Sequence, residues 1–503
     1  MKTIILFLSL LITFQFTHAQ KRGAVWCFGD SALVDFSDIL NISTGHSTVK
    51  SRGTCVSISD TSGQLVLYAF TRAGVNGNSA SVINNQDLQI QFGDSIVGEG
   101  WYHELVIIPN SGNDSSYVLF SVGVTGSSEM GFFYSIIDMS ANGGLGEVIQ
   151  KNVQLENFTA VDCLSAIKHG NGRDWWVIVR KSDYPSGSNN DFYLYLVSPA
   201  GIINQPIQSI GSQNSTNSGR LSFNSSGNRM CFINYKGLIE LNDFDRCTGT
   251  ISNPVTISPE SLSSPWPALW SAEFSPSSER LYVSRIAENA ADSSRLYQFD
   301  LNASNISASK IKIWETSFVT TIAQLKKAPN NKIFIATNFG QVYPYTDSMY
   351  NSINMNLSVI NAPDSLGIAC DLQPFSFYLG GKRSYAGLPN NPDYDLGPLA
   401  GSLCDSLTSI SEPIKNSEAS IYIYYAPGWD KAFINADKLK GHHYRLRVLD
   451  IVGKEVYSEN GNLNSPYFTR DLNCASFASG IYLLIFETEK ERLVRKFEVV
   501  GIK

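Results

Sequence analysis

Short apolar stretches separated by tight polar turns recur along the chain. In each copy, an apolar run leads into a turn rich in Gly, Pro, Asn or Ser, and a second apolar run follows, which is the pattern of a β-hairpin. The six copies lie at residues 57–68, 106–120, 166–178, 221–233, 272–284 and 325–336. Their starts are about 50 residues apart, a spacing typical of the four-stranded blades of a β-propeller.

The number of blades follows from the chain outside these hairpins. The stretches before residue 57 and after residue 325 amount together to nearly two periods, one for the blade of the sixth hairpin and one for an unmarked blade. Seven blades are therefore favoured, and six or eight are the alternatives. We expect the strand around Val25–Phe28 to complete the last blade and clasp the ring. A series of β-sandwiches with accidental spacing is the competing interpretation.

The first 20 residues have the three parts of a secretory signal. Lys2 is the charged start, residues 4–16 are apolar, and Ala19 ends a small-residue cleavage motif, so we expect a signal peptide at residues 1–19. The apolar run is too short to span a bilayer. Signal peptidase and the general export machinery are the expected first partners.

A change in composition divides the remaining chain. We expect the propeller at residues 20–404 and a polar linker without aromatics at residues 405–420. The last unit, residues 421–503, contains two strand pairs. In the first, Tyr444, Leu446 and Val448 alternate with Arg445 and Arg447, which predicts a small Ig-like antiparallel β-sandwich.

The last unit resembles the type A C-terminal sorting domain of Bacteroidetes type IX secretion cargo. The resemblance is carried by residues 446–456, residues 479–484 and Lys496 near the end of the chain. The matching positions are Leu446, Val448, Asp450, Gly453, Lys454, Gly480, Tyr482 and Lys496. The family usually opens with a Pro-Asn-Pro turn, where residues 424–429 stand here, which leaves the start of the domain open.

This resemblance implies a route and a set of partners. The domain would be recognised by the outer-membrane translocon and removed by its sortase, and the protein would be released or attached to surface lipopolysaccharide. The body of the chain also resembles the propeller-like region of large Bacteroidetes surface proteins associated with adhesion and gliding. The shared phrases are residues 134–148, 166–178 and 244–254. They bring no known active site to this chain.

Charge and cysteine content narrow the function classes. Residues 421–503 carry 12 Lys and Arg against 10 Asp and Glu, while the whole chain carries 38 against 45, so the body is acidic. An acidic body argues against nucleic acid as a partner. The eight Cys are scattered, without metal-binding spacing, and both free thiols and two or more disulfides are compatible with export.

Few residues suggest chemistry. Residues 28–31 resemble the nucleophile block of GDS-type esterases, yet no His of the mature chain follows an Asp by three positions. His103 beside Trp101 could touch a metal or a sugar, although a strand end explains it better. His169 could be catalytic, but it lies in a turn sequence. We expect no catalytic residue, no metal and no cofactor.

Aromatic residues are the other candidates for binding. Trp175 and Trp176 are adjacent, so on a strand they face opposite sides, and we expect one in the core and the other exposed. Trp26, Trp101, Trp266 and Trp270 could line a carbohydrate-binding face, with packing between blades as the simpler interpretation. The expectation is an exported, non-enzymatic propeller that binds protein or glycan; the alternative is a propeller hydrolase or lactonase-like enzyme.

Overall fold

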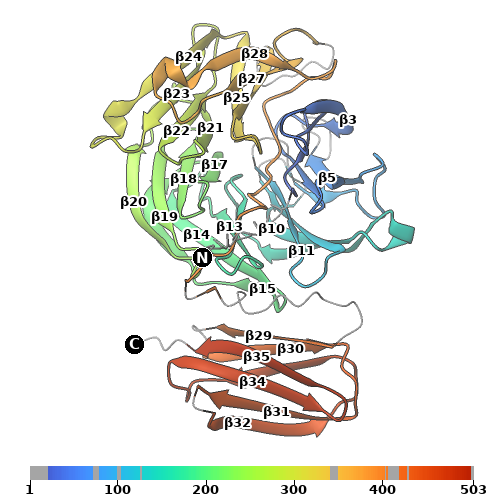
Figure 1. Cartoon of the computed structure of the whole chain (residues 1–503). Coiled ribbons are helices and arrows are strands. Elements are labelled where there is room, and N and C mark those ends of the chain that lie inside the picture. Colours follow the sequence, from blue (N-terminus) through green and yellow to red (C-terminus); the bar gives the residue numbers. More distant parts are fainter. Residues whose placement is uncertain are drawn as a thin grey trace, which may run out of the picture.

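The computed structural model describes residues 21–71, 79–98, 103–124, 127, 129–339, 349–402, 404–405, 419–426, 430–451 and 453–499. Within these ranges the chain forms seven small antiparallel sheets around one axis, followed by two sheets in the C-terminal unit (Figure 1). Three short 3-10 helices lie between strands: η1 (Asn142–Gly144), η2 (Ser307–Ser309) and η3 (Gly367–Cys370). In this described part of the chain, no helix is long and apolar enough to cross a membrane.

Each of the seven sheets is one propeller blade. The first three blades are β1 (Val25–Phe28), β2 (Asp30–Asp35) and β3 (Ser43–Lys50); β4 (Cys55–Ser59), β5 (Leu65–Thr71), β6 (Ser79–Asn84) and β7 (Ile96–Val97); and β8 (Leu105–Pro109), β9 (Ser116–Gly123), β10 (Gly131–Asp138) and β11 (Glu147–Glu156). The fourth blade has five strands: β12 (Ser165–Lys168), β13 (Trp175–Arg180), β14 (Asn189–Ser198), β15 (Gly201–Asn204) and β16 (Gln208–Asn214).

The last three blades have four strands each. They are β17 (Gly219–Phe223), β18 (Arg229–Asn234), β19 (Ile239–Phe244) and β20 (Ile251–Ser258); β21 (Leu269–Phe274), β22 (Arg280–Arg285), β23 (Ser293–Asp300) and β24 (Ile311–Ser317); and β25 (Thr320–Lys327), β26 (Ile333–Phe339), β27 (Asn356–Ile360) and β28 (Leu372–Tyr378).

The six predicted hairpins are the first two strands of blades two to seven, so the predicted propeller is confirmed, with seven blades in the described residues. The prediction for Val25–Phe28 is wrong. This strand, β1, pairs with β2 and opens a blade of its own, instead of completing the last one. Its four residues are all buried, because β1 is the strand of its blade nearest the axis.

Turn residues fix the register of these hairpins by accepting backbone N–H groups. Asp60 Oδ1 accepts the amides of Ser62 and Gln64 at 2.8 and 2.9 Å, and Asn171 Oδ1 accepts those of Arg173 and Asp174 at 3.0 Å. Short polar side chains of this kind close tight turns at little cost. These two turns are therefore closed by contacts within a few positions of the sequence.

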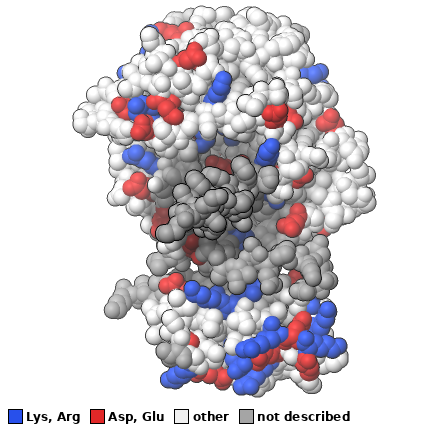
Figure 2. Space-filling view, viewed as in Figure 1, with Lys and Arg blue, Asp and Glu red and all other residues white. Residues whose placement is uncertain are grey.

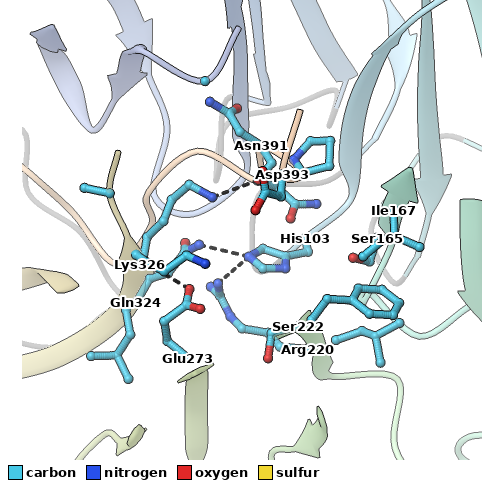
Figure 3. A pocket seen from close by; sticks show the side chains of 18 of the residues that line it. His103, Ser165, Ile167, Arg220, Ser222, Glu273, Gln324, Lys326, Asn391 and Asp393 are labelled. Carbon is cyan, nitrogen blue, oxygen red and sulfur yellow. Dashed lines mark hydrogen bonds between the residues drawn. The ribbon is translucent and has the colours of Figure 1, made fainter. Parts of the chain in front are cut away.

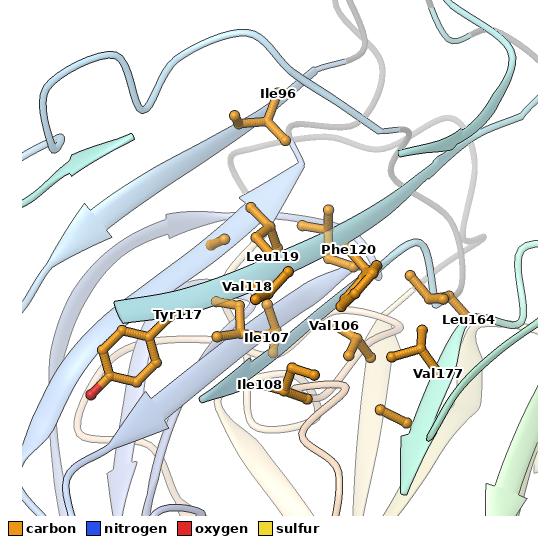
Figure 4. Packing of buried hydrophobic residues seen from close by; sticks show 14 of the residues in the cluster. Ile96, Val106, Ile107, Ile108, Tyr117, Val118, Leu119, Phe120, Leu164 and Val177 are labelled. Atoms are coloured by element: carbon orange, nitrogen blue, oxygen red, sulfur yellow. The ribbon is translucent and has the colours of Figure 1, made fainter. Parts of the chain in front are cut away.

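Apolar side chains from neighbouring blades fill the spaces between the sheets. One cluster runs from the second blade through the third to the fourth, and Figure 4 shows Val106, Ile108 and Phe120 of the third blade packed near Leu164 and Val177 of the fourth. A single blade cannot bury both faces of its sheet, whereas stacking blades in a ring does.

Aromatic packing joins the last blade to the first. The Trp26 ring lies 4.7 Å from that of Phe36, and Phe334 of the seventh blade lies 6.0 Å and 5.3 Å from these two rings. All three belong to one buried cluster that also includes residues of the second blade. The ring is thus closed here by side-chain contact between separate sheets.

The segment after the last blade, residues 383–398, runs through the middle of the ring (Figure 1, orange). We call it the axial segment. Asn390 donates from its side-chain amide to the carbonyls of Leu105 and Leu164, both at 2.9 Å, and its own N–H donates to Cys55 O at 2.7 Å. One residue thereby contacts the inner strands of the second and third blades and the start of the fourth.

The other blades contact the axial segment in the same way. Arg383 pairs with Asp30 of the first blade at 3.2 Å, and Leu388 donates its N–H to Gln324 Oε1 of the seventh at 2.7 Å. The remaining contacts are Trp270 Nε1 of the sixth blade to Ala386 O, at 2.9 Å, and Arg246 of the fifth to Gly397 O, at 2.6 Å. All seven blades are therefore bonded to this one segment.

A disulfide fixes the chain just beyond the axial segment. Cys404 is bonded to Cys247, which follows the third strand of the fifth blade. Among the described residues the other six cysteines are free and buried: Cys27, Cys55, Cys163, Cys231, Cys370 and Cys474. Of the two compatible outcomes named above, free thiols predominate, and the bridge that forms closes a loop of 157 residues.

The C-terminal unit is a sandwich of two antiparallel sheets. One contains β29 (Ser420–Ala426), β30 (Lys431–Asp437) and β33 (Phe468–Asn473), and the other β32 (Glu455–Asn462), β31 (His443–Asp450), β34 (Gly480–Thr488) and β35 (Arg492–Val499). A core cluster joins their inner faces, which confirms the predicted sandwich. Figure 2 shows Lys and Arg side chains gathered on this unit with Asp and Glu among them, while charges of both signs are more scattered over the propeller.

The close fit of the axial segment predicts the effect of one methyl group. A Cβ at Gly387 would collide with the backbone of Gly53, whereas a Cβ at Gly397, in the same segment, would meet nothing within 4 Å. We expect Gly387→Ala to lower the free energy of unfolding by about 1–3 kcal/mol, the usual cost of overpacking. Gly397→Ala is the control, and equal midpoints for both variants in denaturant titrations would contradict this fit.

The disulfide should contribute measurably to stability. Replacing both Cys247 and Cys404 by Ser should lower the free energy of unfolding by about 2–5 kcal/mol, because the unfolded chain loses a constraint on a long loop. Thermal unfolding with and without reductant is the measurement. Reductant should lower the melting temperature of the wild type to that of the double variant and leave the variant unchanged; the same reductant effect on both would assign it to other groups.

Candidate functional site

A cavity of about 310 Å³ lies at one mouth of the channel, beside the axial segment (Figure 3). We call it the mouth cavity. Its lining includes residues of β12, β17, β21 and β25, which are the first strands of the fourth to seventh blades, and residues 390–395 of the axial segment. The labelled side chains are His103, Ser165, Ile167, Arg220, Ser222, Glu273, Gln324, Lys326, Asn391 and Asp393. Most of these are polar, although they stand at the centre of the fold.

His103 is held at the inner end of the cavity by two donors. Arg220 Nη1 lies 2.5 Å and Gln324 Nε2 lies 2.9 Å from His103 Nε2. The Gln324 amide is oriented, because its Oε1 accepts the N–H of Leu388 at 2.7 Å. Burial first, and then the charges of Arg220 and Lys326, lower the pKa of His103 well below its ordinary value. The ring is therefore neutral and accepts hydrogen bonds through Nε2.

Glu273 and Lys326 both line the cavity and attract each other electrostatically. The Glu273 carboxylate accepts the backbone N–H groups of Phe274 and Lys327 at 3.1 and 3.2 Å, and Lys326 Nζ donates to Asn391 O at 2.9 Å. Burial raises the pKa of Glu273 and lowers that of Lys326, and the attraction between the two opposes both shifts. A carboxyl group with a raised pKa and an ammonium thus share one cavity.

The outer rim of the cavity carries two more carboxylates, Asp393 and Asp395. Burial, and then repulsion from Asp393, raise the pKa of Asp395 to about 6, although the side chain keeps part of its surface in solvent. Lys168 lies behind this rim, buried, and donates to Tyr394 O at 2.8 Å. Burial lowers the pKa of Lys168 to about 8.

The cavity lining contains both hydrogen-bond donors and hydrogen-bond acceptors. In the ranges that the structure describes, no three His, Cys, Asp or Glu side chains are grouped so as to hold a metal ion. Amides, carboxylates and ammonium groups within one small cavity suit a ligand that both donates and accepts hydrogen bonds, such as a polyol.

His169 lies outside this cavity, in the turn between β12 and β13. Its Nδ1 accepts the N–H of Asn171 at 3.0 Å, and its Nε2 donates to Cys247 O at 2.9 Å. Burial lowers its pKa. The ring thus braces the turn against the disulfide-bonded loop of the fifth blade.

Trp175 and Trp176 are both buried, so the exposed face expected for one of them is absent. The Trp176 Nε1–H donates to Arg246 O at 2.8 Å, and the Trp175 ring meets the edge of Tyr394 at 5.8 Å. Each face of β13 is covered by a neighbouring blade or by the axial segment. Trp26 and Trp270 are buried as well, Trp266 is half-buried, and Trp101 lies outside the described residues.

The residues of the GDS-like block form the turn between β1 and β2. Gly29 has φ of 63°, and a Cβ there would collide with the carbonyl of Arg383 in the axial segment. Only glycine combines this backbone angle with so close an approach. Residues 28–31 are thus explained by packing.

The positions that match the sorting domain lie in the core of the sandwich, in one of its turns and on its last two strands. Leu446, Val448 and Tyr482 are buried in its core, and the Tyr482 hydroxyl donates to Ala478 O at 2.7 Å. Asp450 Oδ1 accepts the N–H of Lys454 at 2.9 Å across a turn. That turn contains Gly453, with φ of 85°; Gly480 begins β34, and Lys496 is exposed on β35.

Sequence reasoning missed most of the cavity. Arg220, Glu273, Gln324 and Lys326 lie in apolar hairpins and look like ordinary exposed positions of a strand. The axial segment had a signal: residues 388–394 read Leu-Pro-Asn-Asn-Pro-Asp-Tyr, polar and proline-flanked, with no alternation of apolar residues. Such a stretch between the last blade and the linker is not expected to form a strand of a blade.

Comparison with protein families identifies the last unit. Residues 422–500 match the secretion system C-terminal sorting domain, which confirms the predicted resemblance. The chain is therefore type IX secretion cargo, bound for the cell surface or the medium, and its tail interacts with the type IX machinery. No curated protein matches the chain.

Solved structures with similar folds are distant in sequence. A putative 6-phosphogluconolactonase from Bacteroides fragilis is 11% identical with a TM-score of 0.45, over 74% of this chain and 98% of that one. A second, from Bacteroides uniformis, is 11% identical with a TM-score of 0.41, over 63% and 89%. A quinonprotein alcohol dehydrogenase-like protein from Bacteroides thetaiotaomicron is 10% identical with a TM-score of 0.35, over 68% and 73%. Likenesses at this level carry no conclusion about activity.

The buried ammonium of Lys168 gives a prediction with a defined pH dependence. Because its folded-state pKa of about 8 lies below the ordinary 10.5, the charged form opposes folding at pH 7, and this penalty fades as pH rises from about 8 to 10.5. We expect Lys168→Met to melt higher than the wild type at pH 7, with a gain of roughly 2 kcal/mol after loss of the bond to Tyr394 O.

Melting curves between pH 7 and pH 10.5 test this prediction. The advantage of the variant should shrink across that interval, and Lys168→Arg, which keeps the charge, should show no comparable gain. A difference between variant and wild type that stays constant with pH would show that the effect arises from packing.

Proposed function

We propose that the protein is a non-enzymatic binding module, presented at or beyond the cell surface, whose propeller holds a glycan or a polar segment of a protein ligand. The observation that supports it most is the mouth cavity, where hydrogen-bonding groups enclose about 310 Å³ at one end of a channel filled by the chain itself. Polar groups at the centre of a fold are costly unless they are satisfied, and a polar ligand would complete that satisfaction.

The lining favours a ligand rich in hydroxyl groups. A sugar hydroxyl both donates and accepts, and the cavity lining includes the amide of Asn331, the carboxylate of Glu273 and the ammonium of Lys327. Its volume is at the low end for small-molecule sites, which suits the end of a glycan chain. The ligand would enter from the mouth and leave the rest of its chain outside.

A serine-dependent mechanism finds no support in the same geometry. Such a mechanism needs a base free to take the proton of the nucleophile. His103 Nε2 already accepts two N–H groups, from Arg220 and Gln324, and burial disfavours protonation of the ring. This ring is suited to hold the two inner strands together.

The lactonase-like or hydrolase alternative keeps one specific observation in its favour. Glu273 and Asp395 line the same cavity, and the pKa of each is raised, to about 6 for Asp395. A carboxyl group protonated near neutral pH can act as a general acid. The alternative therefore predicts turnover that depends on Asp395, whereas the binding proposal predicts none.

Binding measurements on the full chain test the proposal. Glycan-array screening of the wild type would select a ligand, whose affinity is then measured by calorimetry. Glu273→Gln and Lys327→Met should each weaken binding at least about tenfold, as is typical for central contacts of a site. Glu279→Gln and Lys332→Met, which do not line the cavity, are the matched controls.

Two outcomes would overturn the proposal. Unchanged affinity in both cavity variants would show that the ligand binds elsewhere. Hydrolysis of lactones, esters or glycosides by the wild type, lost in Asp395→Asn, would establish the enzyme in its place.

A further inference from the structure

A second cavity, of about 580 Å³, lies between the fifth and sixth blades. We call it the interblade cleft. It is lined by residues of β19 to β23 and of the connection between the two blades, and it shares no residue with the mouth cavity. Ile239, Ile257, Leu269 and Phe299 are buried beneath it. The cleft thus combines a rigid apolar base with side chains contributed by two blades.

One wall of the cleft is the ring of Trp266, which the structure holds in place. Lys236 Nζ lies 5.4 Å from the centroid of the ring, and Tyr235 meets it edge-on at 6.4 Å. The next residue, Pro267, packs on Gly237, where a Cβ would lie 2.6 Å from its Cγ. A half-buried tryptophan fixed by its neighbours offers contact area with little loss of entropy on binding.

The lining of the cleft also includes a second ring and a cation, Tyr297 and Lys310. Lys310 Nζ lies 3.9 Å from the centroid of Tyr297, and both residues line the cleft. Burial, and then the charges of Arg285 and Arg295, lower the pKa of Lys310. Arg285, Lys310 and Asp292 are the charged side chains among the described residues that line the cleft, so the cations outnumber the carboxylate there.

The neighbouring carboxylates are already engaged by other cations. Asp292 pairs with Arg285, and Glu315 accepts from Arg295 at 2.7 Å and also pairs with Lys312. The charge of Lys310 thus remains to attract an anion that enters the cleft.

We propose that the interblade cleft binds an acidic carbohydrate of the uronic acid class. The apolar face of a sugar ring would stack on Trp266, and a carboxylate would meet Lys310, which lies over the Tyr297 ring. Stacking on an aromatic wall selects a ring-shaped, amphipathic ligand, and the positive end selects a charged one. The site is separate from the mouth cavity and stands independently of the function proposed for it.

Calorimetry with an oligogalacturonate and its methyl ester tests this proposal on the full chain. The two probes share their rings and differ in charge. The wild type should bind the free acid at least about fivefold more tightly than the ester at low salt, and the difference should decrease as salt screens the charge. Equal affinity for the two probes, or no binding of either, would overturn the proposal.

Substitutions then locate the site. Trp266→Ala should weaken both probes at least about tenfold, through lost stacking. Lys310→Met should remove the preference for the acid and leave the ester unaffected. Lys312→Met and Tyr378→Ala, which do not line the cleft, are the controls, and melting curves of all variants confirm folding.

The same series separates this inference from the proposed function. If Glu273→Gln weakens the probes and Trp266→Ala does not, the ligand occupies the mouth cavity, so the cleft proposal fails while the binding function stands. If only Trp266→Ala and Lys310→Met weaken them, the cleft is established whatever the mouth cavity binds.

Discussion

The structure depends on how its seven blades are held in one ring. Each blade buries its faces only against its neighbours, so an opening at any interface would expose apolar surface on both sides. The axial segment opposes this by bonding to all seven blades, through backbone groups and side chains such as Asn390 and Arg383. The axial segment thus helps to hold the ring closed, although no strand in the described part of the chain is shared between the first and last blades.

This arrangement decides what the channel can do. The axial segment runs through the middle of the ring, and the mouth cavity lies beside its residues 390–395. The same side chains line the mouth cavity and connect the blades to the axial segment. Gln324 orients His103 and holds Leu388, and Lys326 reaches Asn391, so the cavity wall and the connection between blades are one hydrogen-bonded unit. A ligand at this mouth would contact groups whose positions are set by the closure of the ring.

More of the fold than of the mouth cavity could be predicted from the sequence. Hairpins are local: residues such as Asp60 and Asn171 close their turns with neighbours a few positions away, so their spacing alone indicates the blades. The place of β1 is different, because a strand next to the axis has the same apolar pattern whether it opens the first blade or completes the last. The burial of both Trp175 and Trp176 could not be predicted for a related reason. Alternation along a strand predicts that the two side chains point to opposite faces, but it does not predict that both faces of the strand are covered.

The cavities depend on contacts that sequence order does not reveal. His103 and Gln324 are more than 200 positions apart and meet only because the ring closes, and Trp266 and Tyr297 face one cleft only because two blades stand side by side. In a ring of like blades, each interface buries a similar set of apolar residues. The two cavities lie where the ring departs from that regularity. Here the two differences are a segment through the axis and a connection that places Trp266 between the fifth and sixth blades.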